Sequence, residues 1–202
     1  MNPPMDPRVT EFHCIMPMVN IPSVLKHGIL SYERTAKVAH ASVAMQPVQD
    51  RRDVKRVPGG LMLHRYANLY FHARNPMMFK RLAEASTLCV LRISTAVAKL
   101  DGAVFTDQNA ASTWVRFLHP SQWAELDFDG VYAMDWRHED RIEYWRRKSK
   151  KCAEVLVPER VEPRFLIGAY VVDADAAARL AAIGFTLPIE AAPVLFFRES
   201  NS

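Results

Sequence analysis

The chain has 202 residues, half of them hydrophobic, and a net charge of +4 at pH 7. This length and composition predict a single domain over residues 1–202 with its own core. No apolar run approaches the roughly 20 residues of a membrane helix, and the N-terminus lacks the basic and apolar regions of a secretory signal. Three cysteines without a CxxC pair and scattered histidines favour a reducing compartment and give no metal-ligand spacing. We therefore expect a cytoplasmic protein with no metal site and no membrane segment.

The first half of the chain mixes strand and helix patterns without a regular repeat. A thirty-residue stretch of poor periodicity predicts a long loop, which in a compact domain tends to be functional or mobile. After the last strand of this half, Asp107 is expected to cap a turn or a helix start. The predicted elements are, in order, a strand at 12–15, a helix at 20–30, the loop at 31–60, a strand at 69–73, a helix from Pro76, and strands at 87–94 and 103–106.

The second half continues in the same irregular way. Because the spacing does not follow a βαβ pattern, the fold class predicted is α+β, not a doubly wound sheet. The predicted elements are a helix from Pro120, a basic helix at 141–151, strands at 153–157 and 165–172, a helix at 173–184 that Gly184 ends, and a last strand at 192–198.

Positive charge is concentrated in two segments. Residues 137–151 hold seven Lys and Arg against three acids, which equals the excess of the whole chain, and residues 51–57 form a second basic cluster. Such segments steer polyanions and nucleotides, or are simply solvated faces. From about residue 130 to residue 151, four aromatic residues lie among the cations, namely Tyr132, Trp136, Tyr144 and Trp145. Such a pattern suits single-stranded nucleic acid through base stacking and phosphate contact.

Standard catalytic motifs are absent from the sequence. There is no GxGxxG, P-loop, HExxH or GxSxG. What remains is a set of polar residues at strand starts and in loops, namely His13, Arg51, Arg52, His64, Tyr70, Arg74, Asn75, Asp107, Asn109 and Glu154.

Five ordered blocks carry a family resemblance. They read FHCIMPMVNIPSVLKHGILS, QDRR, PGGLMLHRYANLYFHARNPMMF, VFTDQNAAS and KKCAEVLV, and they spread from Phe12 to Val157. Together they resemble the DarT family of bacterial toxins, which ADP-ribosylate DNA bases with NAD as donor. The resemblance implies an ADP-ribosyltransferase fold, a split and mainly antiparallel β core with flanking helices and NAD in the cleft.

The same resemblance implies two catalytic residues. Glu154, at the mouth of a late strand, matches the family's catalytic glutamate; without the resemblance it would be read as a solvent-facing carboxylate. Arg52 matches the essential arginine, whose guanidinium suits the NAD diphosphate. Arg51 is the rival for that role, and a plain helix-surface arginine is the alternative.

Further roles follow from the resemblance. His13, Asn20 and Tyr70 are expected to bind the cofactor, although His13 and Tyr70 could instead pack in the core and Asn20 could be only a helix N-cap. Arg74 is expected to meet DNA phosphate or to brace its loop. Arg146 and Arg147, in the basic segment, are expected to bind nucleic acid.

The implied function is that of an NAD-dependent mono-ADP-ribosyltransferase that modifies a base in single-stranded DNA and releases nicotinamide. Relatives act on thymine or guanine, and the motif around residues 68–78 favours guanine slightly. The family also implies a toxin paired with an antitoxin that removes the modification. Two alternatives stay open: a transferase that acts on RNA or protein, and a nucleic-acid-binding module without enzymatic activity.

Overall fold

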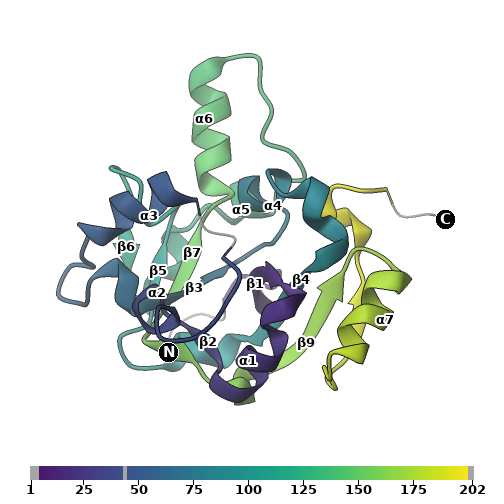
Figure 1. Ribbon diagram of the computed structural model, residues 1–202. Helices are drawn as coiled ribbons and strands as arrows, with labels where there is room; N and C mark the ends of the chain where they lie inside the picture. Colours follow the sequence, from purple (N-terminus) through teal and green to yellow (C-terminus); the bar gives the residue numbers. More distant parts are fainter. Residues whose placement is uncertain (1–4, 43–44, 200–202) are drawn as a thin grey trace.

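A computed structural model describes residues 5–42 and 45–199, and its centre is one eight-stranded sheet (Figure 1). Its order is β10-β9-β4-β1-β3-β7-β5-β6, and every neighbouring pair is antiparallel except β9 and β10. A two-stranded sheet of β2 and β8 lies beside it. The strands are β1 (Glu11–Pro17), β2 (Ile29–Leu30), β3 (Tyr66–Tyr70), β4 (Leu88–Ser94), β5 (Val104–Thr106), β6 (Phe117–Leu118), β7 (Glu154–Pro158), β8 (Arg160–Val161), β9 (Leu166–Val171) and β10 (Ile189–Ala191).

The large sheet consists of two halves with a narrow joint between them. β1 pairs with β4 along its whole length, and β3 pairs with β7 from Tyr66 to Tyr70. Between the halves, however, β1 and β3 share a single register pair, His13 with Tyr70. This joint agrees with the split, mainly antiparallel core that was expected.

The joint is supported from one side by a cluster of phenylalanines. Phe12 meets Phe71 and Phe105 edge to face, with ring centroids 5.4 and 6.0 Å apart, and Phe71 meets Phe128 in the same way at 5.6 Å. All four side chains are buried. Edge-to-face contacts add to the gain from burying apolar area, so hydrophobic packing holds this side of the joint.

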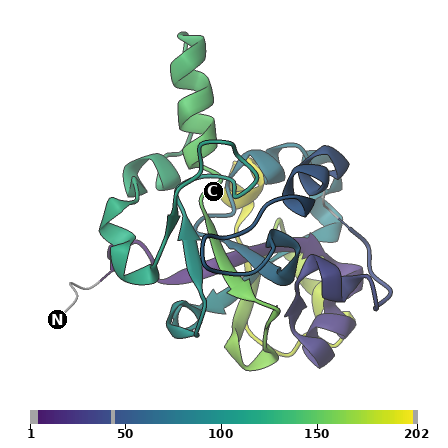
Figure 2. The same cartoon turned by 90° about the vertical axis from the view of Figure 1, so that its left-hand side faces the viewer.

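Helices flank the sheet, and one of them stands away from the body. Helix α6 projects outward in both views (Figures 1 and 2), and none of its residues is buried. In contrast, α7 buries Ala176 and Leu180. In the described ranges, no helix is long and apolar enough to cross a membrane. The α-helices are α1 (Ile21–His27), α2 (Tyr32–Thr35), α3 (Gln46–Asp53), α4 (Pro76–Phe79), α5 (Phe128–Tyr132), α6 (Arg141–Lys150) and α7 (Ala174–Ala182).

The α+β class is confirmed, and most strand predictions are confirmed with small shifts of their ends. Three local predictions are wrong. Residues 192–198 form no strand but hold a 3-10 helix, Pro193–Phe196, that begins at a proline, while the parallel strand β10 lies just before it. Asp107 caps no helix; its carboxylate instead accepts hydrogen bonds from Arg116. The predicted loop at 31–60 contains α3, whose only buried residue is Arg52.

Candidate active site

A row of register pairs brings side chains from four strands onto one face at the joint. His13 of β1 is opposite Tyr70 of β3, Tyr70 is opposite Glu154 of β7, and Glu154 is opposite Thr106 of β5. Directly paired residues of antiparallel strands point to the same face. Three predicted site residues that are far apart in sequence are therefore neighbours, on the face opposite the phenylalanine cluster.

Glu154 is buried and its carboxylate is fixed by three groups. Only 1% of its side chain is exposed. Oε2 accepts hydrogen bonds from Arg52 Nη1 at 3.1 Å and Asn68 Nδ2 at 2.5 Å, and Oε1 accepts one from the backbone N–H of Ala110 at 3.0 Å. The backbone N–H of Glu154 donates to Thr106 Oγ1. A charge this deep is tolerable only when it is paired and hydrogen-bonded, so the surroundings hold a carboxylate in one place.

Arg52 reaches Glu154 from α3 and has donor capacity to spare. Its side chain is 5% exposed, and its second terminal nitrogen, Nη2, is buried with no hydrogen-bond partner among the described residues. A buried donor without an acceptor lowers the stability of the folded protein, and because this donor is charged, an anion would be a favourable partner. Arg51, the rival, is exposed and forms no ion pair in the described part of the chain. The geometry therefore favours Arg52 over Arg51.

His13 is held on both sides of its ring. Nδ1 accepts a hydrogen bond from the Ala73 N–H at 3.0 Å, so Nε2 carries the hydrogen and donates to Glu11 at 3.0 Å. Glu11 also accepts from Arg92 Nε at 2.7 Å. Burial raises the pKa of Glu11, but the bonds from His13 and Arg92 outweigh this effect and bring it to about 2. The ring of His13 is thus locked at the joint, and its nitrogens are already occupied by protein groups.

Tyr70 completes the row between His13 and Glu154. Its pKa is raised well above the ordinary value, first by burial and then by the charge of Glu154. The phenol therefore stays neutral at physiological pH. Tyr70 also packs against the main core, which is one of the two roles that the sequence left open; its contact with the cofactor stays a prediction.

Asn20 does not cap α1 with its side chain. Instead, its amide makes both possible bonds to Ala41: Nδ2 donates to the carbonyl at 2.7 Å, and the Ala41 N–H donates to Oδ1 at 2.8 Å. This fixes the path of the segment between α1 and residue 41. Within that segment, the ring of Tyr32 lies over His64 at 4.3 Å, and His64 contacts Gln49 of α3. The segment is therefore tied to the helix that carries Arg52.

Arg74 braces the fold rather than presenting a free cation. Its guanidinium donates to the carbonyls of Met134 and Val194 and lies 4.0 Å from the centroid of the Phe197 ring. Of the two roles the sequence left open, loop bracing is the one that these contacts describe. The DNA contact stays a prediction. Arg74 would have to make it with the N–H groups that do not donate to these two carbonyls.

Arg146 and Arg147 lie on the projecting helix α6, away from Glu154. Arg146 pairs with Glu143 one turn earlier, and Arg147 is exposed and makes no ion pair with described residues. Lys148 lies over the rings of Tyr144 and Trp145 at 5.1 and 4.7 Å. Helix α6 is thus a solvated surface of mixed cations and aromatic rings that projects from the body of the protein (Figure 1).

Lys151, at the end of α6, is buried without a carboxylate partner among the described residues. It is 1% exposed, and Nζ donates to the carbonyls of Val131 and Ala133 at 2.7 Å each and lies 3.4 Å from His72 Nδ1. Burial, and next the charge of Arg74, lower its pKa to about 8. Because residues 131 and 133 precede the projection, Lys151 clamps the two ends of the α6 excursion together, three residues before Glu154.

Several site residues were missed at the level of sequence. Asn68 could have been found, since the alternation of a strand places it on the same face as Tyr70. Glu11 precedes His13 by two residues and shares its face for the same reason. No local signal marks Ala110, because its contribution is a backbone N–H. Lys151 was counted only as part of the basic segment.

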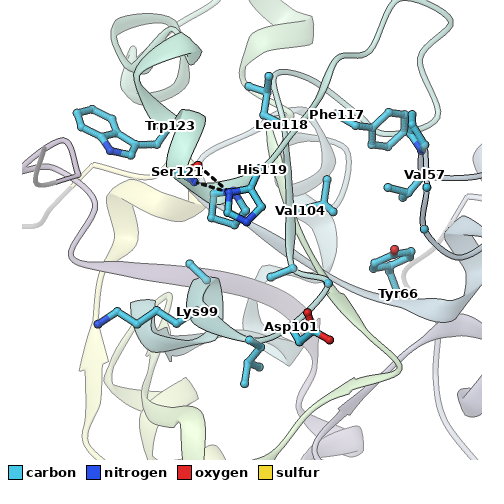
Figure 3. Close-up of a pocket in the computed structure, with 18 of the residues that line it drawn as sticks. Val57, Tyr66, Lys99, Asp101, Val104, Phe117, Leu118, His119, Ser121 and Trp123 are labelled. Atoms are coloured by element: carbon cyan, nitrogen blue, oxygen red, sulfur yellow. Dashed lines mark hydrogen bonds between the residues drawn. The ribbon is translucent and has the colours of Figure 1, made fainter. Parts of the chain in front are cut away.

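A cavity of about 1130 Å³ lies elsewhere, at the end of the sheet formed by β5 and β6 (Figure 3). Its lining includes Tyr66, Phe117 and Trp123, with His119 bonded to Ser121 at the start of a 3-10 helix. None of the predicted site residues lines it. The register row, where the buried charges of Arg52 and Glu154 lie, is therefore the candidate active site. No cluster of three or more metal-ligating side chains occurs in residues 5–42 and 45–199.

Comparison with known proteins gives consistent matches. The family model described as "ssDNA thymidine ADP-ribosyltransferase, DarT" matches residues 13–197. A DNA ADP-ribosyl transferase–DNA ADP-ribosyl glycohydrolase fusion protein of Thermosipho africanus is 32% identical over 205 residues, covering 96% of this chain and 51% of the fusion. A DNA ADP-ribosyl transferase of Thermus sp. is 26% identical over 163 residues, covering 75% of this chain and 76% of that protein.

Solved structures agree. Thermosipho africanus DarTG in complex with ADP-ribose superposes with a TM-score of 0.80 at 29% identity, covering 93% of this chain and 51% of that one. Thermus sp. 2.9 DarT in complex with ADP-ribosylated ssDNA gives 0.82 at 21% identity, covering 96% and 99%, and supports the fold. The chain spans about half the length of the fusion protein. On these matches and the ordered sequence blocks, the chain belongs to the DarT family.

Proposed function

We propose that this protein is an NAD-dependent mono-ADP-ribosyltransferase that modifies a base in single-stranded DNA. The observation that carries the proposal is the buried Glu154 carboxylate, held by Arg52, Asn68 and the Ala110 N–H on the face of the sheet joint. The family membership and the relatives named above support it. NAD is the donor substrate of this reaction.

Glu154 supplies the electrostatic part of the reaction. As the bond between ribose C1″ and the nicotinamide nitrogen breaks, nicotinamide leaves as a neutral molecule and positive charge develops on the ribose. A fixed carboxylate in a site of low dielectric stabilises that charge. The base nitrogen then bonds to C1″, and its proton passes to the carboxylate.

Arg52 fits the donor's diphosphate. Its buried Nη2 has no partner among the described residues, and a phosphate oxygen would satisfy it with a charge-assisted hydrogen bond. Its Nη1 meanwhile remains on Glu154. One guanidinium thus links the anchoring of the donor to the position of the catalytic carboxylate. The locked His13 and the neutral Tyr70 line the same row and define the floor on which the nicotinamide ribose would lie.

For the acceptor we propose thymidine in a single strand. The family description names thymidine, and a Thermus relative has been solved with ADP-ribosylated ssDNA. The slight preference for guanine that the sequence suggested has no support in these comparisons. The cations and rings of α6 suit a flexible strand, because bases stack on rings and phosphates pair with cations.

We further propose that the protein acts as a toxin with an opposing hydrolase. The Thermosipho relative is a fusion of a transferase and a glycohydrolase, and removal of ADP-ribose by a partner would reverse the modification. Co-expression of such a glycohydrolase should rescue growth of cells that express this chain. A hydrolase variant without activity should not rescue it.

The decisive test is incubation of the protein with NAD and short oligonucleotides, followed by mass spectrometry of the nucleosides. ADP-ribose on thymidine is the expected product, and ADP-ribose on guanosine would correct the acceptor. Parallel reactions with RNA and protein test the alternative acceptors. Failure to bind NAD by calorimetry would instead favour a non-enzymatic binding module.

A further inference from the structure

Trp114 is the most exposed large hydrophobic side chain among the described residues. Its exposed fraction is 83%, against 54% for Trp145 and 5% for the buried Trp136. No ring, cation or hydrogen-bond partner contacts it in the described part of the chain. A tryptophan left in water costs free energy that burial would recover, so its exposure calls for a reason.

The loop that carries Trp114 is not loose. Residues 107–116 join β5 to β6, and the loop is closed by Asp107, which accepts from the backbone N–H and Nε of Arg116, both at 2.9 Å. Asn109 Oδ1 accepts from the Ala111 N–H at 2.8 Å, and Lys55 Nζ donates to the Ser112 carbonyl. These hydrogen bonds hold the loop in one conformation, in which the Trp114 side chain is exposed to solvent. A rigid aromatic group loses little entropy when a ligand stacks on it.

The same loop touches the catalytic carboxylate. The Ala110 N–H donates to Glu154 Oε1 at 3.0 Å. Trp114 follows four residues later, which limits its Cα to roughly 14 Å from that of Ala110 even in a fully extended chain. A base attacked beside Glu154 therefore has its neighbours in the strand within reach of this side chain.

A cation lies against the loop as well. Lys55 forms no ion pair with a described carboxylate, and its ammonium lies 5.8 Å from the centroid of the Phe117 ring. Lys55 thus holds the loop at Ser112, two residues before the exposed Trp114. A cation and an exposed aromatic ring on one loop can bind single strands, through phosphate contact and base stacking. A protein partner would need more apolar area than one ring provides.

We propose that Trp114 is a stacking platform for an unpaired base that adjoins the base modified at Glu154, and that it positions the DNA strand for transfer. This inference rests on the proposed function, since it requires a DNA acceptor. It assigns to the loop between β5 and β6 a share of acceptor recognition that is separate from α6.

The test compares wild-type protein with Trp114→Ala and Trp114→Phe, using a single-stranded oligonucleotide that holds one thymidine. Loss of a stacked base costs about 1–3 kcal/mol, or about 5- to 140-fold at 1.4 kcal/mol per tenfold. The KM for DNA should rise by that factor in Trp114→Ala and much less in Trp114→Phe, which keeps a ring. NAD hydrolysis without DNA should not change. Ile167→Ala, on β9 at the other half of the sheet, controls for loss of exposed apolar area.

A second arm identifies the base that stacks. Abasic sites are placed one at a time beside the target thymidine. One of them should raise the KM of the wild-type protein, and Trp114→Ala should lose nothing more with that same oligonucleotide, because coupled partners are non-additive. Additive losses at every position, or an unchanged KM in Trp114→Ala, would refute the inference alone. No DNA modification by the wild-type protein would refute the proposed function and this inference together.

Discussion

Arg52 and Glu154 form a buried ion pair, with Arg52 Nη1 3.1 Å from Glu154 Oε2, that joins a short helix to the start of a central strand. The two residues are 102 positions apart in sequence. Each charge is tolerable at this depth only because of the other. The stability of the folded protein must therefore be measured alongside activity for any substitution at either position.

Glu154→Gln is the cleaner test of catalysis. Glutamine keeps the size of the side chain but removes the charge that stabilises the ribose cation, so transfer should fall by at least about a hundredfold in a folded protein. Both substitutions leave Arg52 without a carboxylate partner, but glutamine still offers an amide oxygen to its guanidinium and alanine offers none, so Glu154→Ala should cost the more stability, about 3–5 kcal/mol. Transfer rates and urea unfolding measure the two effects. A folded Glu154→Gln protein with near-normal transfer would remove Glu154 from the mechanism.

Arg52 and Arg51 should differ sharply in donor binding. Arg52→Lys keeps a charge but loses the second donor arm, Nη2, so NAD affinity should weaken by about 1.5–3 kcal/mol. Arg51→Ala removes an exposed side chain and should change little. Isothermal titration with NAD compares the two. The assignment would be reversed if only the Arg51 variant lost affinity.

Asn20→Ala should weaken the binding of NAD without unfolding the protein. It removes both bonds to Ala41 and frees the segment that is tied to α3, so the KM for NAD should rise while kcat at saturation stays close to normal. Asn75→Ala is a matched control, because Asn75 caps α4 through the N–H groups of Met77 and Met78. That change should cost about 1 kcal/mol of stability and leave the KM for NAD as it was. Equal KM values in both variants would contradict the role given to Asn20.

Neutralising Arg146 and Arg147 should affect DNA and not NAD. Each phosphate contact contributes about 0.7 log units of affinity per log of salt on a single strand, so the double Gln variant should show a flatter salt dependence and less DNA modification. NAD hydrolysis without DNA should be unchanged, since α6 lies outside the catalytic row. Lys99→Gln with Arg164→Gln removes two exposed cations elsewhere and serves as the control. Single strands should also be preferred to duplex, because stacking hides the base edge; equal modification of both with no salt effect would reopen the protein-acceptor alternative.

Because of Lys151, the free energy of unfolding should increase as the pH rises from about 8 to 10.5. Its pKa is lowered to about 8 in the folded state from an ordinary 10.5, so between these values the unfolded chain binds more protons and stability rises with pH. Below about pH 8 both states are protonated and the contribution is constant. Lys151→Met should lose this rise, as measured by the difference in unfolding free energy between the two proteins at pH 7, 8, 9 and 10. Parallel curves for the two proteins would show that the ammonium is not the source.

Local sequence patterns predicted the elements that carry a regular pattern of apolar residues. The strand with Phe12 and the strand with Val155 were found because their apolar residues match the sheet. Helix α3 was missed because the residue it buries is Arg52, which gives no apolar stripe. The predicted last strand failed at Pro193, where a proline starts a 3-10 helix instead.

The site divides in the same way. The family resemblance indicated Glu154 and Arg52, and the structure shows that the two are buried together as an ion pair; their catalytic roles stay predictions. Neither the Ala110 N–H nor the clamp at Lys151 could be read from the chain, because a backbone donor has no residue signature and a buried lysine looks like any other member of a basic run. Arg74 illustrates the reverse: its type suggested phosphate, whereas its position commits the guanidinium to two carbonyls and a ring.

The clamp at Lys151 has a consequence for how this fold can diversify. Lys151 holds the carbonyls of residues 131 and 133 next to the end of α6, so the two ends of the projecting segment are kept together by contacts outside α6. The entropic cost of closing such a segment grows only slowly with its length. Helix α6 buries none of its residues, so its length and sequence can be exchanged while the core, including the buried Trp136, is kept. A version in which a short turn replaces residues 138–149 should fold and still hydrolyse NAD. The projecting segment could then be replaced by another without loss of the fold, so that transfer from the same donor, NAD, would be directed to a different acceptor.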